Sequence, residues 1–167
     1  MSLFCADAFD VLPALEDNSV SAVITDPPYG TTSKKWDKWF DLDLWWKEIN
    51  RILVPNGICV MFCDQPFTSI VVMSNWDNFR YDWLWDKEMN GSSLNAWKRP
   101  IKRSEDILVF SKQTPRWNVK SVLTKLEKPS SRKKLSYRTH DNKQDGSSYL
   151  IHYTDFPLEV LRGFRPV

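Results

Sequence analysis

Four consecutive residues, Asp26-Pro27-Pro28-Tyr29, place a carboxylate, two imino acids and an aromatic ring directly after the apolar run Val20–Thr25. Neither proline has an N–H group and both have a fixed φ, so this turn presents rigid acceptors and almost no donors. Such a corner suits a substrate group that only donates, such as an exocyclic amine. The Asp26 carboxylate and the Pro27 carbonyl can bind the amine hydrogens and draw the nitrogen towards tetrahedral geometry, which frees its lone pair for attack.

Tyr29 adds a flat ring on which a heterocyclic base can stack. The amino group of adenine is a poor nucleophile, because its lone pair is delocalised into the ring, and it is reachable only after extrusion from a duplex. The corner therefore matches an extruded adenine. The alternative is a strand that leaves through a Pro-Pro turn with Tyr29 as a surface aromatic. The buried strand that precedes the motif favours the first interpretation.

Alternating strands and helices are predicted over the first 110 residues. Apolar residues recur at three- and four-residue steps from Leu42 to Leu53, which predicts one apolar face of a helix. Asp41 can cap the start of this helix, and Pro55-Asn56-Gly57 can end it. Phe67–Ser74 predicts a second helix entered through Pro66. This order implies an α/β fold, a partial Rossmann-like parallel sheet with helices on both faces. The predicted strands are Val20–Thr25, Ile58–Cys63, Tyr81–Asp86 and Ile107–Phe110.

In parallel sheets ligands sit beyond the carboxyl ends of the strands, so Thr25–Tyr29 and Cys63–Phe67 are expected side by side. Trp36 and Trp39 follow the turn in a polar loop. They either close over an extruded base, which we favour, or anchor the loop to the core. Trp85 either offers a second stacking face or packs within its strand.

Charge is divided sharply along the chain, whose formal net charge is +2. Residues 1–95 hold 7 basic and 14 acidic side chains, whereas residues 96–143 hold 14 and 4. A basic block of this size either attracts a polyanion such as DNA or is a solvated loop. From Gln113 to Gly146 the periodicity fades, which predicts loops and a hairpin. Candidate DNA-binding residues are Trp36, Trp97, Lys98, Arg99, Lys102, Arg103, Arg116, Arg132, Lys133 and Lys134.

Composition narrows the remaining classes of protein. A chain of 167 residues suits one buried core. The sequence shows neither a run long enough to span a bilayer nor a secretory signal, and its three cysteines do not make a disulfide framework, so we expect the cytoplasm. His140 and His152 have no ligand-type residues at metal spacing, and we expect no metal site.

Most of the sequence resembles the β-class amino-methyltransferases of DNA, particularly adenine-N6 enzymes of phages and prophages. By that resemblance Asp26–Tyr29 is catalytic, Asp7 and Asp26 contribute to an S-adenosylmethionine site, and the basic segment recognises the DNA target. Asp rather than Ser at position 26 favours adenine-N6 over cytosine-N4. The matching segments are Asp7 in Ala-Asp-Ala-Phe, Asn18-Ser19-Val20, Thr25–Thr32, Lys35-Trp36-Asp37, Pro55-Asn56-Gly57, Gln65–Ser69, Trp85-Asp86-Lys87, Asn95-Ala96, Lys98, Pro100 and Ser104–Phe110.

The Gly-rich turn of the family's S-adenosylmethionine site has no counterpart, since no Gly-x-Gly occurs. The resemblance implies a catalytic half at 1–112, a basic recognition appendage at 113–150 and a return segment at 151–167. We expect truncation before the donor half, an exposed edge at Val20–Thr25, and a second polypeptide or second copy that completes the sheet. Alternatives are a non-catalytic DNA-binding or decoy protein, a cytosine-N4 enzyme, or methylation of RNA or of a protein amide.

Overall fold

The computed structural model describes residues 3–87, 96–98, 100–116, 118, 124–133, 148–154 and 160–162. The chain divides into two compact units, Met1–Arg116 with Glu159–Val167, and Trp117–Leu158. In the second unit, β5 (Thr124–Lys133) pairs antiparallel with β6 (Ser148–Thr154). No helix among the described residues has the length and apolar character needed to cross a bilayer.

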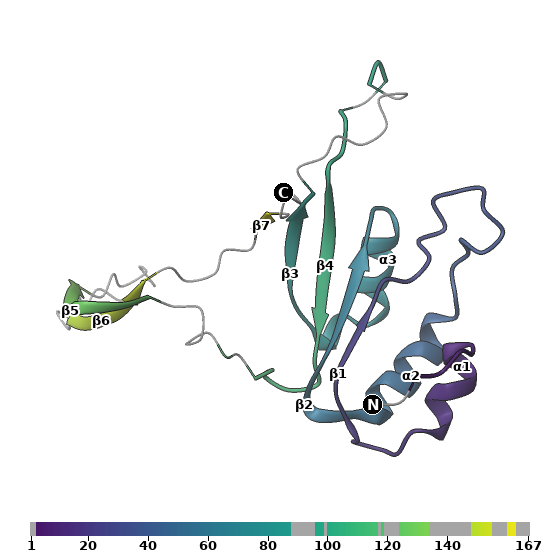
Figure 1. The fold of residues 1–167 in the computed structure, drawn as a ribbon, viewed down its shortest axis with the longest axis horizontal. Helices are drawn as coiled ribbons and strands as arrows, with labels where there is room; N and C mark the ends of the chain where they lie inside the picture. The colour runs from purple at the N-terminus through teal and green to yellow at the C-terminus, as the bar shows by residue number, and fades with distance from the viewer. Residues whose placement is uncertain are drawn as a thin grey trace, which may run out of the picture. The chain divides into compact units, whose positions relative to one another are not determined.

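A five-stranded sheet forms the first unit, with the strand order β1-β2-β4-β3-β7 (Figure 1). β1 and β2 are parallel, as predicted, but β4 runs antiparallel to both β2 and β3. The sheet is therefore mixed: the expected parallel pairing holds for β1 with β2, whereas β4 departs from it. β3 and β4 are adjacent and antiparallel, and their pairing continues past the strands through a bond from Lys87 N to Arg103 O. The strands are β1 (Val20–Thr25), β2 (Leu53–Cys63), β3 (Phe79–Asp86), β4 (Ser104–Phe110) and β7 (Val160–Arg162).

Among the described residues, three α-helices accompany the sheet: α1 (Ala8–Val11), α2 (Leu42–Ile52) and α3 (Phe67–Ser74). Short 3₁₀ turns occupy Leu12–Ala14 and Trp76–Asn78. The Asp41 side chain accepts the Leu44 N–H at the start of α2, which confirms the predicted cap. Pro55-Asn56-Gly57 does not end the helix as we expected, because β2 begins at Leu53 and runs through these residues.

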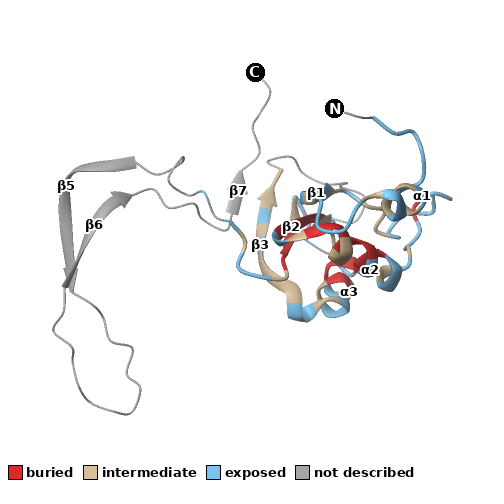
Figure 2. Cartoon of the chain, turned by 90° about the horizontal axis from the view of Figure 1, so that it is seen from below, coloured by how far each residue is buried: buried red, intermediate tan, exposed pale blue. Residues whose placement is uncertain are grey.

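The α/β class is confirmed, but the described helices lie on one face of the sheet and not on both. Trp45 and Trp46 of α2 and Phe67 of α3 share a core with Cys59 and Met61, to which Phe9 of α1 also packs. Figure 2 shows the buried residues concentrated in β2, α2 and α3. The opposite face carries a second apolar cluster of Val60, Ile107 and Val109, packed against Ile58, Phe62, Tyr81, Trp83 and Trp85. Aromatic side chains from β3, and none of the described helices, contribute to that cluster.

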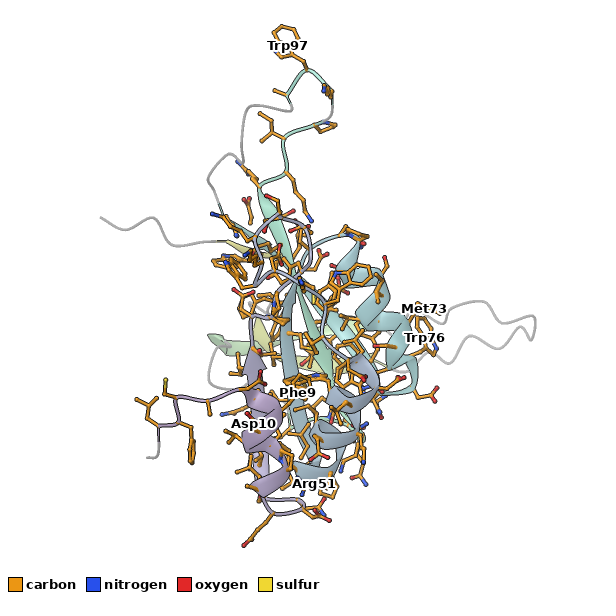
Figure 3. All side chains as sticks on the ribbon, turned by 90° about the vertical axis from the view of Figure 1, so that its right-hand side faces the viewer. Phe9, Asp10, Arg51, Met73, Trp76 and Trp97 are labelled. Carbon is orange, nitrogen blue, oxygen red and sulfur yellow. The ribbon has the colours of Figure 1, made fainter. Side chains whose placement is uncertain are left out.

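Arg51 joins the N-terminal segment to α2 (Figure 3). Its guanidinium bonds the carboxylates of Asp17 and Glu48 and the carbonyl oxygens of Leu12 and Leu15, at 2.6–3.0 Å. Hydrogen bonds to Asp17 and Glu48 raise the Arg51 pKa, so the charge is permanent. The segment that leads into β1 is thus held against the helix that follows it.

Candidate functional site

The turn after β1 forms a corner that is open to solvent. Asp26 is exposed, whereas Pro27, Pro28 and Tyr29 are half-buried. The Tyr29 hydroxyl donates a hydrogen bond of 2.5 Å to Oδ1 of Asp26. The corner is not sealed inside the molecule, and its carboxylate can be reached from solvent.

Phe67 supports the ring of Tyr29 from below. The two rings are stacked, with centroids 6.0 Å apart and planes 25° apart, and Phe67 itself is completely buried at the start of α3. The contact confirms that the turn after β1 and the segment after β2 lie together at one edge of the sheet. Because Phe67 is packed in the core, one side of the Tyr29 ring rests on a close-packed apolar surface.

Charges gather around this corner. Burial, followed by the hydrogen bond to Asp26, raises the pKa of Tyr29 well above its usual value, so the hydroxyl remains a donor. Burial raises the pKa of Cys63, at the end of β2, to about 12, with further contributions from Asp106, Asp26 and Asp64. Since a thiol is nucleophilic only when ionised, the Cys63 thiol is inert at neutral pH. The groups of the corner that remain available to contact a ligand are carboxylates and aromatic rings.

Asp37 organises the loop that follows Tyr29. It is only 6% exposed, and its carboxylate accepts the backbone N–H groups of Gly30 at 2.7 Å and Thr32 at 2.6 Å. A hydrogen bond from the Thr32 side chain, together with the backbone bonds, lowers the Asp37 pKa. An ionised carboxylate therefore fixes the backbone immediately after Tyr29.

The loop tryptophans were expected either to close over an extruded base or to anchor the loop to the core. Trp39 anchors the loop. Its Nε1 donates to the carbonyl of Tyr29 at 2.6 Å, and its ring lies 6.3 Å from Phe67. It also occupies the space where Gly30, at φ +67°, would carry a side chain. Trp36 by contrast is 72% exposed. Trp85 packs edge-on against Phe62, so ordinary packing describes it.

Several basic side chains at the same edge of the sheet form ion pairs with carboxylates. Lys102 pairs with Asp64, Arg103 with Asp86 at 2.8 Å, and Lys87 with Glu105. The Thr68 hydroxyl donates to Asp106 at 2.7 Å, which ties α3 to β4. Lys102 and Arg103, which we expected to bind DNA, are therefore partly neutralised by carboxylates of the sheet.

The remaining sequence-predicted residues are scattered. Trp97 is 99% exposed on the β3–β4 connection, beyond the packed body in Figure 3, with exposed Lys98 beside it. Arg116 lines a cavity of about 300 Å³ with Ser21 and Asn56, near the amino ends of β1 and β2 and so away from Asp26. Arg99 and Lys134 lie outside the described residues, as do the side chains of Arg132 and Lys133. Asp7 caps α1 by accepting the Phe9 N–H at 2.9 Å.

Sequence reasoning did not assign roles to Asp37 and Phe67, although both lie in segments that carry the resemblance. A signal for Asp37 was present, since it is the one acidic residue among Lys34, Lys35, Trp36 and Lys38. An isolated carboxylate in a basic loop is a candidate acceptor for backbone N–H groups. Nothing comparable marked Phe67, which reads as an ordinary apolar helix residue.

Comparison with known proteins gives a consistent result. A family profile for N6/N4 methyltransferases, described as DNA methylase, matches residues 20–163. The Type II methyltransferase M.HpaI of Haemophilus parainfluenzae is 29% identical over 120 residues, 66% of this chain and 38% of that protein. This chain therefore spans less than half the length of that curated relative.

Solved structures share the fold. The PvuII DNA methyltransferase, described as cytosine-N4-specific, superposes with a TM-score of 0.62 at 17% identity, over 95% of this chain and 55% of that one. M1.HpyAVI, solved as a complex with SAM, gives a TM-score of 0.50 at 22% identity, over 96% and 64% of the two chains. In both matches nearly all of this chain is aligned with between half and two thirds of the other chain.

Proposed function

This chain belongs to the N6/N4 DNA methylase family, and from that premise we propose that it is the methyl-acceptor half of a DNA adenine-N6 methyltransferase. The observation that carries the proposal is the open corner in which the exposed Asp26 carboxylate accepts the Tyr29 hydroxyl, while the Tyr29 ring is stacked on buried Phe67. The corner combines acceptors for an amine with a surface for a base.

Each part of the corner has a separate task in this proposal. The extruded base stacks on the free face of Tyr29, because Phe67 supports the other face. Asp26 replaces its bond from the Tyr29 hydroxyl with one from the base amine, and the Pro27 carbonyl accepts the second amine hydrogen. The nitrogen then becomes more nucleophilic, and Asp26 stabilises the positive charge that develops on it as the N–C bond forms. A sulfonium donor would leave as a neutral thioether when its methyl–sulfur bond breaks, and the surplus amine proton would pass to solvent at this open corner. Holding the reactants in line supplies further rate.

Adenine-N6 is the proposed acceptor, and cytosine-N4 is the second candidate. Both bases carry an exocyclic amine with two hydrogens, so the corner suits either. The resemblance associates Asp at position 26 with adenine. We retain cytosine-N4 as the second candidate because the PvuII enzyme is described as cytosine-N4-specific, although the likeness to that enzyme extends to the fold alone.

S-adenosylmethionine, with which M1.HpyAVI was solved, is the proposed donor and supplies an electrophilic methyl group. In this chain Asp26 fits a position beside that group, since it is exposed at the carboxyl end of β1. Asp7 fits less well, because its carboxylate caps α1. We propose that other residues, in addition to Asp26, complete the donor pocket.

The open edge of β1 supports a partner. Within the described part of the chain β1 pairs with β2 alone, and Ile24 on it is 70% exposed. An unpaired apolar edge readily adds another strand, and a strand added there would create the switch point at which ligands of α/β sheets bind. We propose that a donor-half polypeptide, or a second copy of this chain, pairs with β1. Sedimentation showing a compact monomer with no affinity for a donor half would contradict this.

DNA is the proposed macromolecular substrate. Exposed Trp97 and Lys98 on the β3–β4 connection are the described residues of the basic block best placed to reach it. Arg99, Arg132, Lys133 and Lys134 remain proposed contacts. Arg116 is a weaker candidate because it lies near the amino end of β1.

The decisive assay incubates the chain with labelled S-adenosylmethionine and duplex DNA, with and without a donor-half polypeptide, and identifies the methylated nucleoside after digestion. We expect N6-methyladenine only when the donor half is present. Asp26→Ala should abolish it, whereas Asp77→Asn, an exposed carboxylate before β3, should not. N4-methylcytosine would select the second acceptor. DNA binding without methylation in every combination would instead indicate a non-catalytic DNA-binding protein.

A further inference from the structure

We propose that the segment Thr31–Lys38 is a second DNA-contacting element, in which Lys34, Lys35, Trp36 and Lys38 meet the strand beside the target base and buried Asp37 holds them in place. The inference rests on the proposed function, because it takes DNA as the ligand. It places a contact surface in the acidic half of the chain, apart from the basic block at residues 96–143.

Local charge first distinguishes this segment. Three of the seven basic residues in the otherwise acidic stretch 1–95 fall at positions 34, 35 and 38. All three are exposed, and within the part of the chain that the structure describes none of them forms an ion pair. Lys87, Lys102 and Arg103 are by contrast engaged with carboxylates. The segment therefore offers unneutralised cations where a phosphate backbone would pass.

Trp36 provides an aromatic surface in the middle of these cations. It is 72% exposed, in contrast to Trp45 and Trp46 of the neighbouring helix, which are buried. Trp36 is thus a solvent-exposed indole ring flanked by lysines. Surfaces that bind nucleic acid combine the same two features, because cations contact the phosphates and an aromatic ring stacks on a base or sugar.

The segment is held in a defined shape, unlike a freely solvated charged loop. Two backbone bonds close its turn, from Asp37 N to Lys34 O at 3.1 Å and from Lys38 N to Trp36 O at 3.0 Å. The Asp37 side chain points inward to the N–H groups of Gly30 and Thr32. The exposed side chains on either side of it are thereby fixed on the outer surface of the loop.

The segment Thr31–Lys38 is also adjacent to Tyr29 in the chain. The segment begins two residues after Tyr29, and the same Asp37 carboxylate that holds the turn also bonds Gly30, the residue next to Tyr29. A strand held by Lys34, Trp36 and Lys38 would present its extruded base to the adjacent corner. Asp37 is a positioning residue in this arrangement, since it touches neither the DNA nor the reacting atoms.

The first test measures duplex binding by fluorescence anisotropy at several salt concentrations. Log K for DNA binding falls with the logarithm of the salt concentration, and each phosphate contact contributes about 0.9 to the magnitude of that slope. The variant Lys34→Gln/Lys35→Gln/Lys38→Gln should therefore reduce the magnitude of the slope by roughly 2 to 3. Lys47→Gln, an exposed lysine on α2 outside the segment, is the matched control and should leave the slope unchanged. A triple variant with the wild-type slope overturns the proposal.

The second test separates position from charge. Asp37→Asn keeps all three lysines and removes a negative charge, so charge alone predicts tighter DNA binding. If Asp37 positions the lysines, the variant should bind DNA about three- to tenfold more weakly, since charge-assisted bonds to the turn are lost. Unchanged or tighter binding would overturn the role of Asp37. Thr32→Val, which removes only a hydroxyl, should act in the same direction with a smaller effect.

These outcomes are distinguishable from failure of the proposed function. If the wild-type chain binds no duplex DNA at low salt, the DNA substrate itself is wrong. If it binds with a salt slope that the lysine substitutions do not alter, the proposed function stands and only the assignment of Thr31–Lys38 fails. Circular dichroism of each variant shows whether the fold has been retained.

Discussion

The Tyr29 hydroxyl is bonded to Oδ1 of Asp26 at 2.5 Å, so without substrate the tyrosine occupies an acceptor that the proposed amine needs. Burial raises the Tyr29 pKa, which keeps this donor protonated at physiological pH. An incoming base must therefore exchange one hydrogen bond for another at Asp26, and the exchange leaves the carboxylate continuously satisfied. The ring of Tyr29 can stay on Phe67 throughout.

Substitutions of Tyr29 should separate the ring from the hydroxyl. Tyr29→Phe keeps the stack on Phe67 and removes the competing donor, so KM for DNA should fall or stay equal and kcat should remain within about threefold. Tyr29→Ala removes the ring, and loss of one stacked base predicts a decrease in kcat/KM of roughly 5- to 150-fold. Methyl transfer with the donor half present measures both. Equal loss in the two variants would show that the hydroxyl, and not the ring, is essential.

Arg51→Ala should destabilise the protein without touching the corner. It leaves Glu48, a carboxylate only 8% exposed, without its partner, and it frees the carbonyls of Leu12 and Leu15. We expect a loss of about 2–3 kcal/mol in the free energy of unfolding, as for a buried charge-assisted network. Urea denaturation measures it. Lys47→Ala, on the exposed side of the same helix, should change stability by less than about 0.5 kcal/mol.

Gly30→Ala should displace Trp39. The added Cβ would clash with Nε1 of Trp39, and φ +67° is itself unfavourable for alanine by about 1–2 kcal/mol. The bond from Trp39 to the Tyr29 carbonyl would be lost, so methyl transfer should fall. Because the clash needs both side chains, Gly30→Ala/Trp39→Ala should cost less stability than the sum of the single variants. Additive costs in denaturation experiments would show that the contact is absent.

The cysteines predict an alkaline limit to stability. Burial raises the pKa of both Cys59 and Cys63 to about 12 from 9.0, so the unfolded chain loses these protons first as pH rises. Stability from the pair is complete below about pH 9 and declines towards pH 12. At pH 10 we expect a loss of roughly 2–3 kcal/mol relative to pH 8, from 1.36 kcal/mol per pKa unit. Cys59→Ala/Cys63→Ala should reduce that pH dependence in urea denaturation.

Thiol labelling gives an independent measurement. In the native protein a thiol reagent at pH 8 should modify Cys5 alone, since Cys5 is exposed and the other two thiols are buried. All three should react after unfolding. Rapid labelling of Cys63 in the native state would mean that the end of β2, beside Asp26, becomes exposed to solvent.

Local sequence was sufficient for features that depend on neighbouring residues. The bounds of β1 and α3 agree with the predicted ranges, and Asp41 caps α2 as expected, because strand alternation, helix periodicity and capping act over a few residues. Pro55-Asn56-Gly57 does not mark the end of the helix, because β2 already begins at Leu53. The three residues lie in a register irregularity between Leu53 and Ile58, which pair with Val20 and Ala22 of β1, and this pairing joins segments that are distant in the sequence.

What the sequence determined by itself is the donor-poor corner, because Asp26, Pro27 and Pro28 impose its chemistry wherever the strand ends. Only the tertiary structure decided what surrounds that corner. Phe67 beneath Tyr29, Asp37 behind Gly30, and the pairing of Lys102 with Asp64 across 38 positions all depend on how strands and loops are brought together. Burial and distance create those roles, and neither is a property of residue type.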